Sequence, residues 1–113
     1  MYIDFLYWAE CPSYPQAWQR LQDALNALAI EAEVQRVEIT TDEEAQRWGF
    51  PGSPTILVNG EDIDPAAKRL PARLSCRLYY RDDGRPSPLP PESMIRRALV
   101  AVQAREQQLQ KGN

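Results

Sequence analysis

Cys11 and Cys76, the two cysteines of this 113-residue chain, are the side chains best suited to covalent chemistry. Cys11 follows an apolar run at residues 2–8 and precedes a segment of helical period. We therefore expect it at the N-terminus of a helix, where unsatisfied N–H groups favour a thiolate. Because thiolates attack disulfides, the sequence predicts thiol–disulfide chemistry at Cys11. The alternative is a small buried hydrophobic residue at a strand end.

The residue three positions after Cys11, where a dithiol enzyme would carry its second cysteine, is Tyr14. A phenol cannot attack a mixed disulfide, so an external low-molecular-weight thiol would have to resolve one formed on Cys11. The Tyr14 hydroxyl is expected either to hydrogen-bond the Cys11 sulfur or to leave the ring packed over the first turn of the helix.

The composition excludes several kinds of site and partner. The chain has no histidine, so a Cys₂His₂ or His₃ zinc site and a Cys–His catalytic pair cannot be built from it. No apolar run approaches the ~20 residues of a membrane span, and Asp4 interrupts the N-terminal one, so we expect a cytoplasmic protein. The net charge of −3 argues against a nucleic-acid partner, although residues 65–113 are basic.

Hydrophobic periodicity predicts four strands and three helices. The strands are expected at residues 2–8, 33–39, 55–58 and 76–81. The helices are expected from Ser13 to about Ile30, from Thr41 to Trp48 and from about Pro91 to about Gln110. This β-α-β-α-β-β-α order predicts one α/β domain over residues 1–113, with the first two strands parallel and the last two antiparallel.

Short motifs are expected to mark the ends of these elements. Residues 13–16 and 41–44 have the pattern of capping boxes at helix N-termini. Asn59–Gly60 is expected to form a tight turn. The strand at residues 33–39 is expected at a sheet edge, with a bulge, because its apolar residues are out of phase.

A Cys-Pro after the first strand and a Gly-Ser-Pro-Thr sequence at residues 52–55 resemble the thioredoxin-like superfamily in its glutaredoxin-sized form. The resemblance implies a four-stranded mixed sheet with helices on both faces. It implies that Cys11 is the catalytic thiol, that Pro12 and Ser13 are spacers, and that Tyr14 replaces the resolving cysteine.

The resemblance also implies a cis peptide bond between Ser53 and Pro54. The backbone of Ser53 would then be free to pair with an extended substrate or a glutathione-like peptide beside Cys11. A narrower resemblance is to small bacterial thioredoxin-like proteins sometimes labelled alkylmercury lyase-like. The matching motifs are Glu10–Pro12, Phe50–Thr55, Cys76–Tyr79 and Asp83–Gly84.

Cys76 is the other candidate for a resolving thiol. A disulfide needs Cα atoms within ~7 Å. In the usual topology of the thioredoxin-like fold, the fourth strand starts at the end of the sheet away from the active site. We therefore expect Cys76 to fill the core beside Leu78, and a Cys11–Cys76 disulfide is the minor alternative. Arg77, Tyr79 and Arg81 would then form the opposite, charged face of an edge strand.

The expected function is that of a monothiol thiol–disulfide oxidoreductase, or a redox protein that binds small thiols, acting through Cys11. Its substrate would be a disulfide or a small thiol, and no other cofactor is expected. One alternative is a non-catalytic thioredoxin-fold module that binds another protein or a second copy of itself. Another is binding of a soft metal such as mercury by Cys11 and Cys76.

Overall fold

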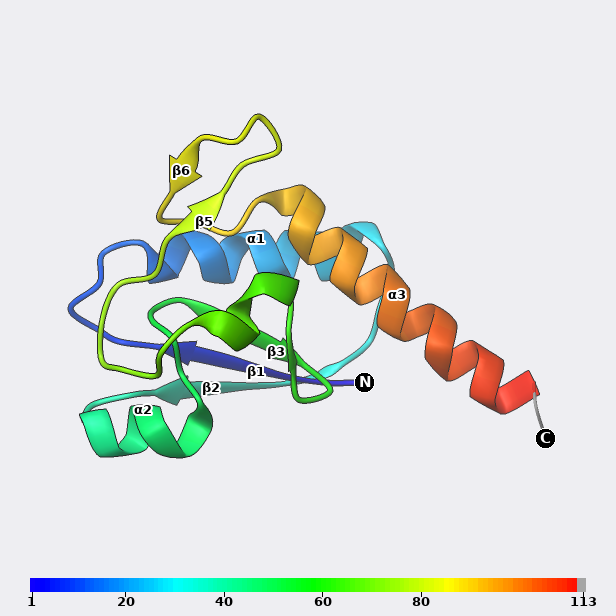
Figure 1. Ribbon diagram of the computed structural model, residues 1–113. Helices are drawn as coiled ribbons and strands as arrows, with labels where there is room; N and C mark the ends of the chain where they lie inside the picture. The colour runs from blue at the N-terminus through cyan, green and yellow to red at the C-terminus, as the bar shows by residue number, and fades with distance from the viewer. Residues whose placement is uncertain (112–113) are drawn as a thin grey trace.

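A four-stranded mixed sheet runs through the centre of the protein's computed structural model, which describes residues 1–111 (Figure 1). Its spatial order is β2-β1-β3-β4, built from β1 (Tyr2–Tyr7), β2 (Glu33–Glu38), β3 (Thr55–Val58) and β4 (Glu61–Asp62). β1 is parallel to β2, and β3 is antiparallel to β1 and β4. The α/β class, the parallel first pair and the edge position of β2 are confirmed. The expected bulge is wrong, because β1 and β2 pair without interruption.

Helices cover both faces of the sheet, as Figure 1 shows. α1 (Tyr14–Ala27) and α3 (Glu92–Lys111) pack on one face, and α2 (Asp42–Trp48) packs on the other. Within residues 1–111, no helix combines the length and apolar character needed to cross a bilayer.

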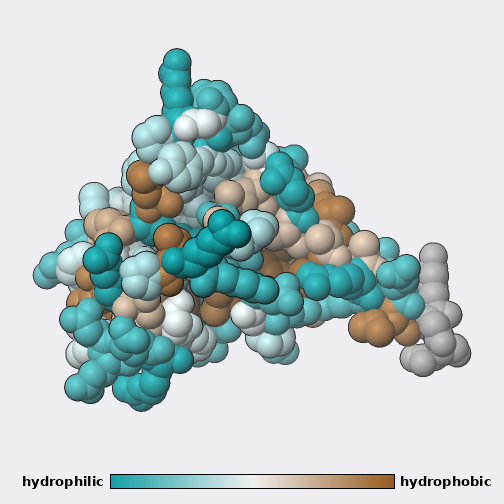
Figure 2. All heavy atoms as spheres, in the orientation of Figure 1, coloured by the Kyte–Doolittle hydropathy of each residue, from teal (hydrophilic) through white to brown (hydrophobic). Residues whose placement is uncertain are grey.

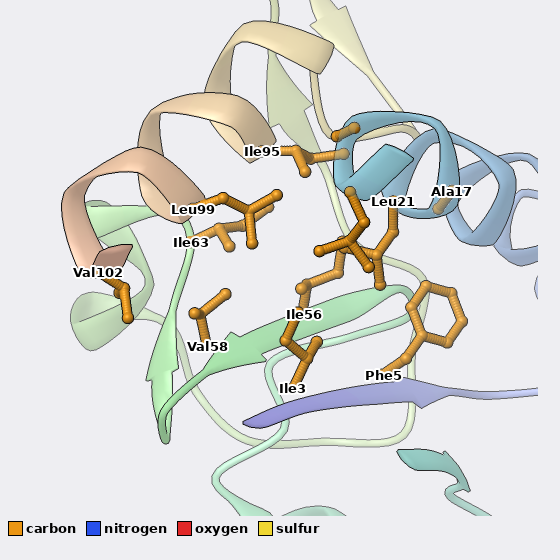
Figure 3. Packing of buried hydrophobic residues seen from close by; sticks show 12 residues of the cluster. Ile3, Phe5, Ala17, Leu21, Ile56, Val58, Ile63, Ile95, Leu99 and Val102 are labelled. Atoms are coloured by element: carbon orange, nitrogen blue, oxygen red, sulfur yellow. The ribbon is translucent and has the colours of Figure 1, made fainter. Parts of the chain in front are cut away.

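Two hydrophobic cores bury both faces of β1. In the larger one, side chains of β1 and β3 meet those of α1 and α3 (Figure 3); among them are Ile3, Phe5, Leu21, Ile56 and Leu99. The smaller one, on the α2 side, is formed by Leu6, Ile39, Ala45 and Phe50. Because both faces are buried, β1 is fixed at the centre of the sheet. Its C-terminal end leads directly to Cys11.

The two expected capping boxes behave differently. At α2, the Glu44 N–H donates to Thr41 Oγ1 at 3.1 Å, and the expected N-cap is confirmed. At α1, Ser13 is the N-cap residue but its side chain makes no capping hydrogen bond, so the box at residues 13–16 is wrong. The Ser13 hydroxyl instead lies 3.6 Å from the Cys11 sulfur.

The fourth strand of the sheet is not residues 76–81, as the sequence predicts, but β4 at Glu61–Asp62. Asn59 and Gly60 both have positive φ (50° and 85°), as a type I′ hairpin turn requires, so the chain returns at once beside β3. A 3₁₀ helix, η1 (Pro65–Arg69), follows. The predicted strand contributes only β5 (Tyr79–Tyr80), which pairs with β6 (Pro86–Ser87) in a separate small sheet.

The alternation predicted for residues 76–81 is present with its two faces exchanged. Arg77 and Tyr79 are buried, at 4% and 0% exposure, whereas Cys76, Leu78 and Tyr80 are exposed. The expectation that Cys76 fills the core beside Leu78 is therefore wrong. The physical reason is a buried ion pair of Arg77, described below with the site.

The backbone of Arg77 lies close to Gly52, so a substitution at Gly52 tests whether the two segments are packed together. Gly52 has a φ of 141°, and an added Cβ would lie 3.0 Å from Arg77 Cβ and 3.1 Å from its Cα. We expect Gly52→Ala to lower the free energy of unfolding by roughly 2–4 kcal/mol, from backbone strain plus displacement of Arg77.

Gly84→Ala is the matched control, because Gly84 also has a positive φ (84°) but no atom within 4 Å of an added Cβ. Its loss should be about 1 kcal/mol, since only strain remains. Urea denaturation measures both variants. Equal losses would contradict the close contact between residues 52 and 77.

Candidate thiol site

Cys11 lies in the loop between β1 and α1, with its side chain 1% exposed. The loop is a tight one, because the Cys11 N–H donates to the Trp8 carbonyl at 3.0 Å. The Cys11 thiol donates to the Ser53 carbonyl at 3.5 Å and shares a 3.6 Å contact with the Ser13 hydroxyl, in which either atom can be the donor. The sulfur is thus enclosed by its own loop and by Ser53.

Ser53 joins three parts of the site. Its peptide bond to Pro54 is cis, as predicted, and its hydroxyl accepts a hydrogen bond from the Trp8 N–H at 3.0 Å. Its own N–H donates to the Ser75 carbonyl at 2.8 Å, and its carbonyl accepts from the Arg77 N–H at 2.9 Å. The expectation of a free Ser53 backbone is therefore wrong, because residues 75–77 of the same chain are paired with it.

This pairing brings Cys76 to Cys11. Ser53 and Cys76 form an isolated parallel β-bridge, and the Ser53 carbonyl contacts the Cys11 sulfur at 3.5 Å, so the Cys76 and Cys11 thiols lie close enough to interact. Interaction with the Cys11 side chain, partial burial and the negative charge of a Cys11 thiolate together raise the pKa of Cys76 to about 11. Both thiols are free, Cys11 buried and Cys76 exposed. The expectation that Cys76 starts a strand at the end of the sheet away from Cys11 is wrong, because the chain after η1 runs back to Ser53.

A buried ion pair holds residues 75–79 in place. The Arg77 guanidinium donates two hydrogen bonds to the Asp62 carboxylate, at 2.7 and 3.0 Å, and a third to Thr55 Oγ1 at 3.1 Å. Asp64 lies 3.8 Å away. A two-pronged arginine–carboxylate contact fixes orientation as well as distance. Breaking such a buried pair typically costs about 3–5 kcal/mol, because one charge is left uncompensated.

Tyr79 provides a second anchor for the same segment. Its ring lies under the Arg77 guanidinium, 4.4 Å from ring centre to Cζ. Its hydroxyl donates to the Pro54 carbonyl at 2.6 Å. Burial raises the pKa of Tyr79, so the phenol stays protonated and remains a donor. Arg77 and Tyr79 therefore tie the segment that carries Cys76 to the loop that carries the cis proline.

Pro12 and Tyr14, which are also predicted site residues, make no hydrogen bond to either thiol among residues 1–111. Pro12 is exposed. The Tyr14 ring stacks on Tyr7 with centres 4.6 Å apart, and among residues 1–111 its hydroxyl has no hydrogen bond to Cys11. Of the two roles expected for Tyr14, the structure shows the packing one. In the part of the chain that the structure describes, no group of three or more Cys, Asp or Glu side chains is arranged to hold a metal ion.

Sequence reasoning missed Asp62, Ser75, and the positioning role of Arg77 and Tyr79. The useful signal was the Asn59–Gly60 turn, which predicts that the residues after it return beside β3. That return places Asp62 opposite Leu57 in the register of the sheet. The spacing of the sequence gives no corresponding signal for Arg77 as its partner.

A protein-family model described as a domain of unknown function (DUF2703) matches residues 12–99. The matched region begins one residue after Cys11 and includes Ser53, Asp62, Cys76 and Arg77. No curated protein and no solved structure matches the chain significantly.

Because Cys11 raises the pKa of Cys76, it should also set the pH at which Cys76 is alkylated. In the wild-type protein, alkylation of Cys76 should rise with a midpoint at about pH 11. Cys11→Ser removes the thiolate and the sulfur acceptor, so the pKa of Cys76 should fall toward the ordinary ~8.5, with alkylation at pH 9 at least roughly tenfold faster. Iodoacetamide labelling followed by mass spectrometry measures both rates.

Tyr14→Phe is the control for this comparison, because it removes a neighbouring hydroxyl that bonds to neither thiol among the described residues. It should leave the Cys76 midpoint unchanged. A midpoint that is the same in wild type and Cys11→Ser would show that the two sulfurs do not interact.

Proposed function

We propose that this chain, which belongs to the DUF2703 family, is a thioredoxin-like thiol–disulfide oxidoreductase in which Cys11 and Cys76 reversibly form a disulfide. The single observation that carries the proposal is that Ser53 contacts both free cysteines: its carbonyl lies 3.5 Å from the Cys11 sulfur, and its backbone forms a β-bridge with Cys76. Two thiols held together can exchange two electrons with a substrate disulfide without an external thiol. The proposal thus replaces the expected monothiol cycle with a dithiol cycle.

Several features support the thioredoxin-like part of the proposal. The sheet has the order β2-β1-β3-β4, with a parallel β1–β2 pair joined by α1 and an antiparallel β3. A cysteine follows β1, and a cis proline, Pro54, precedes β3. The Cys11 sulfur lies against the residue before that proline, at 3.5 Å from the Ser53 carbonyl.

The proposed reaction needs only the two protein thiols and the substrate disulfide. One protein thiolate attacks a sulfur of the substrate disulfide, forms a mixed disulfide and expels a substrate thiolate. The second protein thiolate then attacks the protein sulfur of the mixed disulfide and expels the other substrate thiolate. The products are a Cys11–Cys76 disulfide and two substrate thiols, so two electrons and two protons have passed to the substrate.

Binding of a soft metal ion is a second candidate that the same arrangement favours. Thiolates select soft ions, and a two-coordinate ion such as Hg(II) needs only a pair of them. The absence of a third ligand group among residues 1–111 suits this coordination number. In this case both sulfurs would be protected from alkylation by one equivalent of Hg(II).

Oxidation followed by mass spectrometry tests the proposed function. After mild oxidation with diamide, the wild-type monomer should lose two hydrogens and show a Cys11–Cys76 cross-link in a tryptic digest; dithiothreitol should reverse it. Cys11→Ser and Cys76→Ser should each form no such cross-link. A wild-type protein that forms only mixed disulfides, or none, would contradict the dithiol cycle and favour a metal-binding or non-catalytic role.

A further inference from the structure

We propose that Cys76, rather than Cys11, is the sulfur that exchanges with the substrate, and that the substrate is an extended polypeptide docking beside Leu78 and Tyr80. This inference rests on the proposed Cys11–Cys76 redox pair. Within that pair, Cys76 reacts with the substrate, and Cys11 is the partner that forms the internal disulfide.

The two cysteines differ in their access to solvent. Exchange requires a thiolate to reach one sulfur of a disulfide, and the sulfur it can reach determines which bond partner is expelled. Cys11 is 1% exposed and enclosed by Ser13 and Ser53, whereas Cys76 is exposed to solvent. An incoming thiolate can therefore reach Cys76 from solvent, with Cys11 as the leaving group.

The chain itself occupies the backbone beside Cys11. The N–H and C=O of Ser53 are paired with Ser75 and Arg77. A substrate cannot use these groups while residues 75–77 remain in place, and the Arg77–Asp62 ion pair holds them there. A polypeptide or small thiol substrate is thus excluded from Cys11 and directed to the outer side of this segment.

The outer side of the segment has the properties of a docking edge for an extended chain. Ser53 pairs with residues 75 and 77, and in the part of the chain that the structure describes, the backbone groups of Cys76 and Leu78 have no hydrogen-bond partner. An unpaired extended edge is where a peptide can add as a further strand. The fixed neighbour Arg77 keeps this edge in position.

Apolar side chains next to Cys76 favour a polypeptide over a small thiol. Leu78 and Tyr80 are 52% and 59% exposed and share the face of Cys76, at successive intervals of ~6.6 Å along an extended chain. Figure 2 shows a small patch of hydrophobic residues near β5, one of several on this face. A peptide with apolar residues around its cysteine would cover these side chains, whereas glutathione presents charged groups to them.

In the oxidised protein, a substrate thiolate attacks the Cys76 sulfur, the Cys11–Cys76 bond breaks, and its electron pair leaves with Cys11, which then takes a proton. A second thiolate of the polypeptide attacks the substrate sulfur of the mixed disulfide and releases Cys76. The polypeptide dithiol is oxidised to a disulfide and the protein is reduced; the same steps in reverse reduce a polypeptide disulfide.

Single-cysteine variants identify the exchanging sulfur. The probe is a synthetic peptide with one cysteine between leucines, activated as its thionitrobenzoate disulfide, and release of thionitrobenzoate reports the rate. At the high-pH plateau of each variant, Cys11→Ser, which keeps Cys76, should react at least tenfold faster than Cys76→Ser. An equal or faster rate with Cys76→Ser would overturn the assignment, even if the wild type forms the disulfide. Failure of the wild type to form the disulfide would instead refute the proposed function.

A second comparison tests the docking surface. In the Cys11→Ser background, Leu78→Ser should slow reaction with the peptide at least threefold and leave the rate with the small neutral probe hydroxyethyl disulfide unchanged. Val100→Ser is the matched control, because Val100 is a similarly exposed apolar residue (47%) on α3. Equal rates for Leu78→Ser and Val100→Ser with the peptide, or equal slowing with both probes, would overturn polypeptide docking at this surface.

Discussion

The structure of the site depends on two backbone hydrogen bonds between Ser53 and residues 75 and 77. They join the loop before β3 to a segment that follows it by more than twenty residues in the chain. The same segment is also held by the Arg77–Asp62 ion pair and by the hydrogen bond from the Tyr79 hydroxyl to the Pro54 carbonyl. Two hydrogen bonds alone contribute about 1 kcal/mol each, so the buried charges and the aromatic ring supply the rigidity. Cys76 meets Cys11 as a consequence of this anchoring.

Burying Arg77 costs desolvation free energy, and we interpret its role as positioning the segment that carries Cys76. Removing two charges from water carries a penalty that an ion pair only partly offsets, so well-packed apolar residues would often serve stability as well. An arginine–carboxylate pair differs from apolar packing in fixing the direction as well as the depth of the residue that carries it. Here Arg77 is buried and the adjacent Cys76 is exposed to solvent.

Most strand and helix positions could be predicted from the sequence, because hydrophobic period and end motifs depend on neighbours within a few residues, and the cis proline could be predicted from the resemblance of its motif to a known superfamily. The location of Cys76 could not. The face of residues 76–81 formed by Cys76, Leu78 and Tyr80 is the more apolar one, so hydrophobicity assigns it to the interior. The ion pair between Arg77 and Asp62 reverses that choice, and its partners are fifteen residues apart with η1 between them. Alternation therefore predicts the two faces correctly but not which one is buried.

The most direct test of this account is amide hydrogen exchange of Ser53 and Arg77 in the reduced protein, followed by NMR. If residues 75–77 are paired with Ser53 in solution, both N–H groups should exchange as slowly as the paired amides of β1 and β3. Exchange at the rate of an unstructured peptide would contradict the account, because the segment would then be free and nothing would hold Cys76 against Cys11.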